Sequence, residues 1–187
     1  MSVSAEKGVL LHAAVRKNEV TEIRSLLKGN AALVDFQEDG LTPLMSALAR
    51  GRRDGNVNAF ECLLAYRPNL NIKNKVSFSF FGLNFELNVE QFMVGENVQA
   101  GMTALILASC FGHIDCIRLL LSQNPLPDID AQDNEGMTAT MHAAFAGNTE
   151  AVKLISAMCE PNLALRNKVI LQLIIISSEF VRYNMLD

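Results

Sequence analysis

The fold of this chain is decided by the phrase Gly101-Met-Thr-Ala-Leu-Ile-Leu-Ala-Ser-Cys-Phe-Gly112, which occurs in three versions. The other two are Gly40-Leu-Thr-Pro-Leu-Met-Ser-Ala-Leu-Ala-Arg-Gly51 and Gly136-Met-Thr-Ala-Thr-Met-His-Ala-Ala-Phe-Ala-Gly147. Each version begins Gly-x-Thr, continues with apolar and then small residues, and closes on a glycine at the same distance. A fixed internal repeat indicates an array of stacked units. Such arrays offer long surfaces rather than deep catalytic pockets, so the repeat favours binding over catalysis.

A second helical pattern follows each phrase. After Gly112, apolar residues recur at 114, 117, 120 and 121, which is the spacing of a helix with one buried stripe. A polar loop, such as residues 128–135, then leads to the next unit. One unit is therefore a turn, a helix, a tight turn, a second helix and an extended loop. We expect helices near 10–17, 20–28, 43–50, 58–65, 104–111, 114–122, 139–146 and 149–157, and any regular strand only within 76–94.

The unit resembles the ankyrin repeat, which is roughly 33 residues long and carries the motif Thr-Pro-Leu-His-x-Ala. Thr42-Pro43-Leu44 matches the first three letters of the motif, and Leu11-His12-Ala13-Ala14 keeps its second half. Alanine replaces the proline in the later units. The position of the motif histidine is filled by His12, Met45, Ile106 and Met141, and a fifth copy would place it at Ile174.

This resemblance implies an all-α solenoid of stacked helix-turn-helix units that forms a single domain over residues 1–187. The units span about 5–37, 38–73, 98–132 and 133–165, with a non-repeat insertion at 76–99 and an atypical segment at 169–187. The threonine of each phrase is expected to cap the first helix of its unit. Gly51, Gly112 and Gly147 stand where that helix must stop, a position that favours a left-handed backbone.

The insertion follows from the spacing of the phrases. The motif histidine positions are separated by 33, 61 and 35 residues. Four of the extra residues lengthen the tight turn between Gly51 and Asn56, and deleting the 24 residues from Val76 to Gln99 restores a spacing of 33. The deleted segment alternates apolar and polar residues, which is a strand or hairpin signal, and holds five of the ten phenylalanines.

Two origins of this segment fit the sequence. It is either a loop insertion of the kind that repeat proteins tolerate, or a translated intron, since Lys75-Val76-Ser77 is what an exon end followed by a donor site would encode. The same Lys-Val junction recurs at Lys168-Val169, where the repeat pattern stops. The alternative for this tail is the apolar first helix of a degenerate, truncated fifth repeat.

Composition excludes several classes of function. The 187 residues carry a net charge of −4, and the lysines and arginines do not cluster as they do in nucleic-acid-binding proteins. The start of the chain lacks the apolar core of a signal peptide, and the longest apolar stretch, Val169–Ile176, is too short to span a membrane. The cysteines at 62, 110, 116 and 159 lie within helical patterns, as reduced thiols do. We expect a monomeric cytoplasmic or nuclear protein with no nucleic-acid or membrane partner.

No group of residues predicts catalysis, a cofactor or a metal. Cys110, His113 and Cys116 look like metal ligands, but the two cysteines fall on different helices and the ankyrin pattern usually has a histidine after the glycine. The resemblance gives His12 the role of tying neighbouring loops by hydrogen bonds. His142 is expected at a half-exposed groove position. The acidic residues Asp128, Asp130 and Asp133 lack the glycine and distal glutamate of a calcium loop and are expected to be solvated.

The resemblance also implies a non-enzymatic protein-binding module whose contacts lie on the concave face, at the hairpin tips and the ends of the first helices. Phe111 and Phe145 would form an apolar hot spot there, or else pack between units. The module is a scaffold or adaptor, or alternatively a targeting fragment of a larger multidomain signalling enzyme or a docking inhibitor of an enzyme. The expected contact residues are Arg16, Lys17, Glu38, Asp39, Leu41, Arg50, Met102, Phe111, Asn134, Glu135, Met137 and Phe145.

Overall fold

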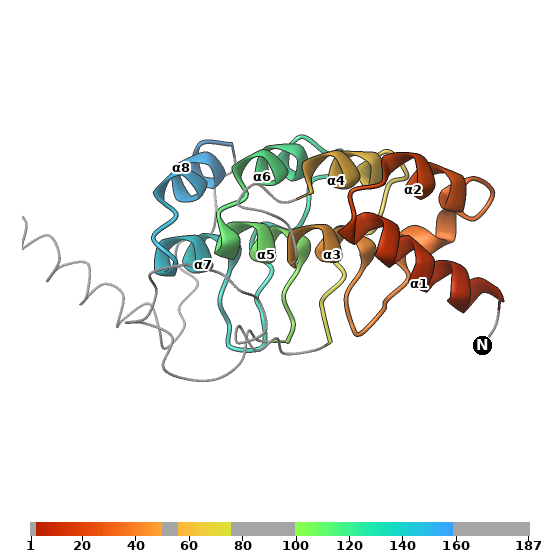
Figure 1. The fold of residues 1–187 in the computed structure, drawn as a ribbon. Coiled ribbons are helices and arrows are strands. Elements are labelled where there is room, and N and C mark those ends of the chain that lie inside the picture. Colours follow the sequence, from red (N-terminus) through yellow and green to blue (C-terminus); the bar gives the residue numbers. More distant parts are fainter. Residues whose placement is uncertain (1–2, 50–55, 76–99, 159–187) are drawn as a thin grey trace, which may run out of the picture.

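The computed structural model describes residues 3–49, 56–75 and 100–158, which form two layers of helices (Figure 1). The first helix of each unit lies in one layer and the second helix in the other, and the hairpin loops extend from the first layer to one side (Figure 1). The first helices are α1 (Val3–Arg16), α3 (Pro43–Ala49), α5 (Ala104–Phe111) and α7 (Ala139–Phe145). The second helices are α2 (Val20–Leu27), α4 (Val57–Leu64), α6 (Ile114–Leu121) and α8 (Thr149–Met158). These pairs are units 1 to 4.

The predicted all-α fold is confirmed. The structure has no regular strand in the described residues, and the predicted helix bounds agree with the observed ones to within one residue or so, except at α1. The strand expected within 76–94 and the tail at 169–187 lie outside the described residues. A short 3-10 helix, η1 (Ala31–Asp35), was not predicted.

Helix α1 begins at Val3 instead of residue 10, because unit 1 has further helix where the other units have a hairpin tip. The extension packs on Phe36: a side chain at Gly8 would overlap the Phe36 ring. The extension leaves Val9 and Leu10 exposed, at 39% and 56%. They stand at the positions that are Thr42 and Pro43 in unit 2.

The turns within the units follow the predicted chemistry. The hydroxyl oxygens of Thr42, Thr103 and Thr138 accept hydrogen bonds from amides three residues later, at 3.3–3.4 Å. Gly112 and Gly147 adopt φ values of 71° and 72°. In unit 1 Asn18 takes the place of this glycine with φ 59°, which asparagine tolerates better than most residues. Gly51 lies outside the described residues.

One polar side chain after each tight turn ties neighbouring units together. Asn56 donates to the carbonyls of residues 15 and 16 at 2.9 and 3.3 Å, and Asn148 donates to those of residues 109 and 110 at 2.9 Å each. His113 Nε2 donates to the Leu48 carbonyl at 3.2 Å. We call these contacts the helix-end ties. They satisfy carbonyls that the end of a helix leaves without partners, and they give His113 the structural role predicted for it.

A single apolar core runs between the layers from Leu11 to Ile155. The thiols of Cys62, Cys110 and Cys116 are free, as predicted, and Cys159 lies outside the described residues. Burial raises the pKa of Cys110 to about 11 and that of Cys116 to about 12. Both thiols are therefore protonated at neutral pH.

Two buried serines at the first-helix layer give a testable contrast. The Ser109 hydroxyl finds no hydrogen-bond partner within the described part of the chain, whereas the Ser46 hydroxyl lies 2.8 Å from His12 Nδ1. We expect Ser109→Ala to stabilise the array by about 1 kcal/mol, since it removes an unsatisfied buried group and places a better helix former. Ser46→Ala should cost about 1 kcal/mol. Urea denaturation of both variants measures this, and effects of the same sign would contradict it.

Candidate protein-binding surface

The hairpin tips of units 2 to 4 are joined into a continuous edge by hydrogen bonds. The amide of Lys75 donates to the Gly40 carbonyl at 3.1 Å, and the amide of Asn134 donates to the Ala100 carbonyl at 3.2 Å. The Lys73 ammonium adds a bond of 2.7 Å to the Gln132 carbonyl. We call this surface the hairpin edge, made of residues 38–41, 73–75, 100–102 and 132–137. Because the tips are linked, side chains carried on them keep fixed spacings.

A buried carboxylate closes the tip of unit 4. One oxygen of Asp133 accepts the amides of Glu135 and Met137 at 2.9 Å each, and the other accepts His142 Nε2 at 2.7 Å. Burial alone would raise the pKa of Asp133. The hydrogen bonds from His142 and the two amides outweigh burial and hold this pKa below its usual value.

This pair corrects two expectations from the sequence. Asp133 is 6% exposed instead of solvated, and His142 is 8% exposed instead of half-exposed in a groove. The reason is that the hairpin folds back on α7 and brings residues nine apart in sequence into contact. Asp128 is exposed, as expected, and Asp130 is partly buried.

His12 is buried at the junction of units 1 and 2. Its Nε2 donates to the Phe36 carbonyl at 2.9 Å, and Nδ1 lies 2.8 Å from the Ser46 hydroxyl, which donates to it when the ring is neutral. Desolvation lowers the pKa of His12, against the opposing effects of the Phe36 carbonyl and the Glu38 carboxylate. The predicted hydrogen-bonding role is confirmed for the loop at Phe36, whereas the second partner, Ser46, lies on helix α3 and not in a loop.

The expected contact residues differ in how exposed they are. Glu38 and Arg16 are partly buried and form an ion pair at 2.6 Å, so neither charge is free on the edge. The expected position Arg50 lies outside the described residues. The exposed members are Lys17, Asp39, Asn134 and Glu135.

Three expected contact residues are instead part of the core. Leu41, Met102 and Met137 are 8%, 1% and 5% exposed, so their side chains do not face a partner. Each stands between the glycine and the threonine of its phrase, where the chain turns back into the array. The signal was present in the sequence, because this position is a large apolar residue in all three phrases.

The two phenylalanines differ in their surroundings. Phe111 is half-buried, packs against the core and places its ring centroid 5.7 Å from that of His113. Phe145 is also half-buried, but it does not belong to the cluster that the described core residues form. The two rings therefore do not make an equal pair, and Phe145 is the one that the described core leaves uncommitted.

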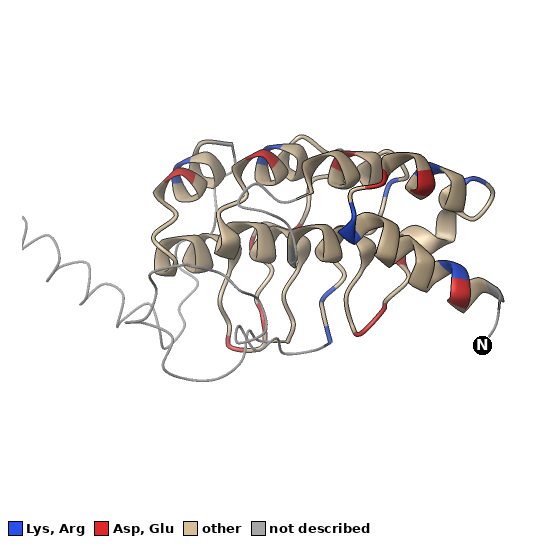
Figure 2. Cartoon of the chain, viewed as in Figure 1, with Lys and Arg blue, Asp and Glu red and all other residues tan. Residues whose placement is uncertain are grey.

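Charge is distributed unevenly between the layers (Figure 2). Helices α3, α5 and α7 contain no lysine, arginine, aspartate or glutamate. The charged residues of the described chain lie on α1, on the second helices and on the loops (Figure 2). The first helices of units 2 to 4 thus present a neutral layer next to a charged hairpin edge.

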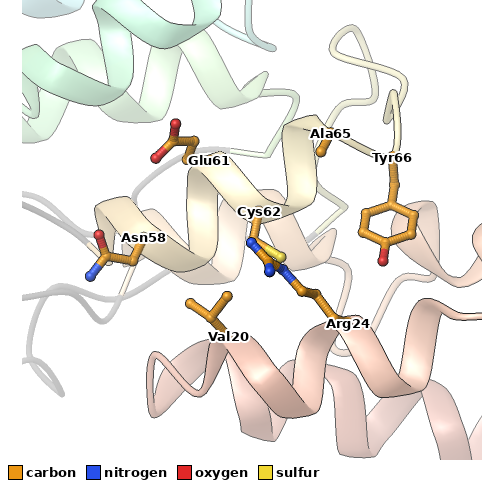
Figure 3. Close-up of a pocket in the computed structure, with 7 residues that line it drawn as sticks. All are labelled: Val20, Arg24, Asn58, Glu61, Cys62, Ala65 and Tyr66. Carbon is orange, nitrogen blue, oxygen red and sulfur yellow. The ribbon is translucent and has the colours of Figure 1, made fainter.

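A groove between α2 and α4 was not predicted (Figure 3). Its volume is about 610 Å³, and the guanidinium of Arg24 points toward Cys62 at its centre. It is open because Cys62 and Ala65 present short side chains there. Two junctions further along, Arg118 and Glu150 bridge the gap between α6 and α8 at 3.7 Å. The groove is lined by Val20, Arg24, Asn58, Glu61, Cys62, Ala65 and Tyr66.

Comparison with known proteins agrees with this geometry. A model of the ankyrin repeat matches residues 39–75, and a model of three ankyrin repeats matches residues 82–164, so more than half of the chain is covered. The chain belongs to the ankyrin repeat family. Its relatives include the human transient receptor potential cation channel subfamily A member 1, which is 30% identical over 151 residues. That match covers 74% of this chain and 13% of the channel subunit.

Ankyrin repeats are generally protein–protein interaction modules. No group of three or more His, Cys, Asp or Glu residues in the described ranges could hold a metal ion. None of the described helices is long and apolar enough to cross a membrane. The linked hairpin edge and the neutral first-helix layer are therefore the best-supported candidate surface of this ankyrin array.

Proposed function

We propose that this ankyrin array is a non-catalytic scaffold or adaptor that binds a partner protein on its concave face. That face consists of the hairpin edge and the ends of the first helices. The observation that carries the proposal is the hydrogen-bonded hairpin edge, which holds tips from three units in one register. A surface that is ordered before binding loses less conformational entropy when it binds.

The exposed groups indicate the chemistry of the partner. The edge carries charges of both signs, since Asp39 and Glu135 are acidic and Lys73 and Lys75 are basic, and Asn134 adds an amide. Phe145 is the last residue of α7, a helix that contains no Lys, Arg, Asp or Glu. A protein segment with an apolar anchor and flanking side chains of both charge signs complements this surface.

Catalysis is not part of the proposal, because the groups that could perform it are otherwise used. His12 and His142 are both engaged in buried hydrogen bonds. The Cys110 thiol, with a pKa of about 11, is a poor nucleophile at neutral pH. We propose no cofactor, no metal, no nucleic-acid or membrane partner, and a monomer. A cytoplasmic location, with the nucleus as the alternative, remains a prediction.

A second function is favoured by the length comparison. The chain spans 13% of the channel subunit that it matches, so similar arrays occur as one part of much longer proteins. The array is then the targeting arm of a larger protein, such as a signalling enzyme. A docking inhibitor of an enzyme uses the same surface. All of these functions require the concave face to bind protein.

The test is a single substitution at the uncommitted ring. We expect Phe145→Ser to weaken partner binding about thirtyfold, which corresponds to about 2 kcal/mol for a hot-spot aromatic, while the helical circular dichroism is unchanged. Partners are captured from cell extract with the parent array, identified, and then titrated by calorimetry. Changing Phe111 as well would confuse the result, since that ring packs on the core.

Arg24→Ser is the matched control, because Arg24 is exposed in the groove on the other helix layer. It should leave the affinity unchanged. A folded Phe145→Ser variant that binds as tightly as the parent would reject the concave-face assignment. Loss of affinity in Arg24→Ser alone would place the partner in the α2–α4 groove.

A further inference from the structure

We infer that residues 76–99 are an addition to an ankyrin array that is already complete without them, joined to it at the tip of the third hairpin. The inference rests on the residues that flank the segment, and it is independent of the proposed function. The described residues on both sides of the segment determine how the hairpin of unit 3 is closed.

The third hairpin is closed by hydrogen bonds across the segment. The Asn74 amide donates to the Met102 carbonyl at 2.9 Å, and the Gly101 amide donates to the Asn74 carbonyl at 2.9 Å. The Asn74 side-chain oxygen accepts the Met102 amide at 2.6 Å. Asn74 and Met102 are both almost fully buried. Residues 28 apart in sequence are thus paired as partners in a tight turn.

The same three bonds close the fourth hairpin, where no residues are added. The Asp133 amide donates to the Met137 carbonyl at 3.0 Å, and the Gly136 amide donates to the Asp133 carbonyl at 3.1 Å. The Asp133 side chain accepts the Met137 amide at 2.9 Å. The glycines also correspond, since Gly101 has φ 93° and Gly136 has φ 80°.

The match fixes the length of the added segment. In unit 4, three residues separate Asp133 from Met137. In unit 3, three residues separate Asn74 from Met102 once residues 76–99 are set aside, namely Lys75, Ala100 and Gly101. The hydrogen bonds and the spacing of the repeat therefore identify the same 24 residues as the added segment.

Both boundary residues are held by neighbouring units. The Lys75 amide bonds to the Gly40 carbonyl of the second tip, and the Ala100 carbonyl accepts the Asn134 amide of the fourth. The points where the segment leaves and rejoins the array are thus fixed by the array itself. Joining Lys75 directly to Ala100 reproduces the turn that unit 4 already has.

Removing the segment should stabilise the protein, because closing a long loop costs more entropy than closing a short one. For the full chain lacking residues 76–99, we expect the melting temperature to rise by roughly 4–8 °C with unchanged helical circular dichroism. The matched controls remove one residue fewer, 76–98, and one more, 76–100. Both shift the register of the tip, and the second removes the Ala100 carbonyl that accepts Asn134.

A melting temperature at or above that of the parent, and above both controls, supports the inference. The inference is overturned if the variant lacking 76–99 melts below the parent. It is also overturned if all three deletion variants melt at the same temperature. Asn74→Ala gives a second measurement that is useful even if one deletion folds poorly. It should lower the melting temperature of the parent and of the deletion variant by the same amount, because the bonds of Asn74 belong to the array. A loss confined to the parent would overturn the inference.

Loop insertion and translated intron both predict a separable segment. Mature transcripts read between the codons of Asn74 and Met102 distinguish them. Messages that all retain codons 76–99 establish an insertion, and messages that lack these codons establish an intron. In either case the protein without the segment presents the same four units.

Discussion

Replacing Asp133 by alanine is expected to destabilise the array by about 3 kcal/mol, because three hydrogen bonds to a buried carboxylate are lost at about 1 kcal/mol or more each. The substitution leaves the Met137 amide and His142 Nε2 without an acceptor in a buried place. It also opens the turn that brings the fourth hairpin against α7. Urea denaturation followed by circular dichroism measures the change in the free energy of unfolding.

Asp133→Asn is the matched control, because Asn74 closes the third hairpin with a side-chain amide oxygen in the same position. We expect a smaller loss, about 1–2 kcal/mol. If both variants cost the same, the negative charge is not what stabilises the tip.

The same pair makes stability depend on pH in a defined direction. The folded protein holds the pKa of Asp133 below the ordinary value of 3.8. The resulting stabilisation is complete above that value and is lost as the pH falls through the lower folded pKa. The parent should therefore lose more stability than Asp133→Asn on acidification below pH 3.8. Equal losses in the two proteins would contradict the assignment.

Gly112→Ala is expected to cost about 3 kcal/mol, from two separate causes. An alanine at φ 71° is strained by about 1–2 kcal/mol. Its Cβ would also lie 2.8 Å from Asn148 Oδ1 and 2.9 Å from Asn148 Cγ. The displaced amide then loses its helix-end tie to two carbonyls, at about 1 kcal/mol for each bond.

Gly147→Ala separates these causes. Gly147 has φ 72°, and a side chain there would meet no atom of the described residues within 4 Å. This variant should show only the backbone strain of about 1–2 kcal/mol. Chemical denaturation of both variants gives the difference, and equal costs would show that the tie to Asn148 contributes nothing to stability.

Much of the fold could be predicted from sequence because the repeat is in register. The threonine caps, the left-handed glycines and the apolar stripes each predict local structure, and several copies support the same bounds. The structural role of His113 followed from its place after Gly112. The predicted start of α1 was wrong because unit 1 lacks a hairpin tip. The contact of Gly8 with Phe36, on which the added part of the helix packs, joins residues that are far apart in sequence.

The candidate surface was less predictable, because exposure depends on how each tip folds. Leu41, Met102 and Met137 stand at tips but point into the core. The Asp133–His142 pair required a hairpin to fold back on a helix, and the Arg16–Glu38 pair required two segments 22 residues apart to meet. The α2–α4 groove arises from short side chains facing an adjacent helix, which no motif describes.

The helix-end ties give the stack a polarity. In each of them the donor belongs to the later unit and the acceptor to the unit before it. In a one-dimensional stack, the coupling between neighbours decides how far a local opening spreads. When a later unit opens, it withdraws donors and exposes the helix end of its predecessor. When an earlier unit opens, it leaves its successor with an asparagine or histidine side chain that water can satisfy. The coupling itself is reciprocal, because either opening breaks the same bonds. The two openings differ in the group left to water, which is a backbone carbonyl on the earlier unit or a side-chain donor on the later one.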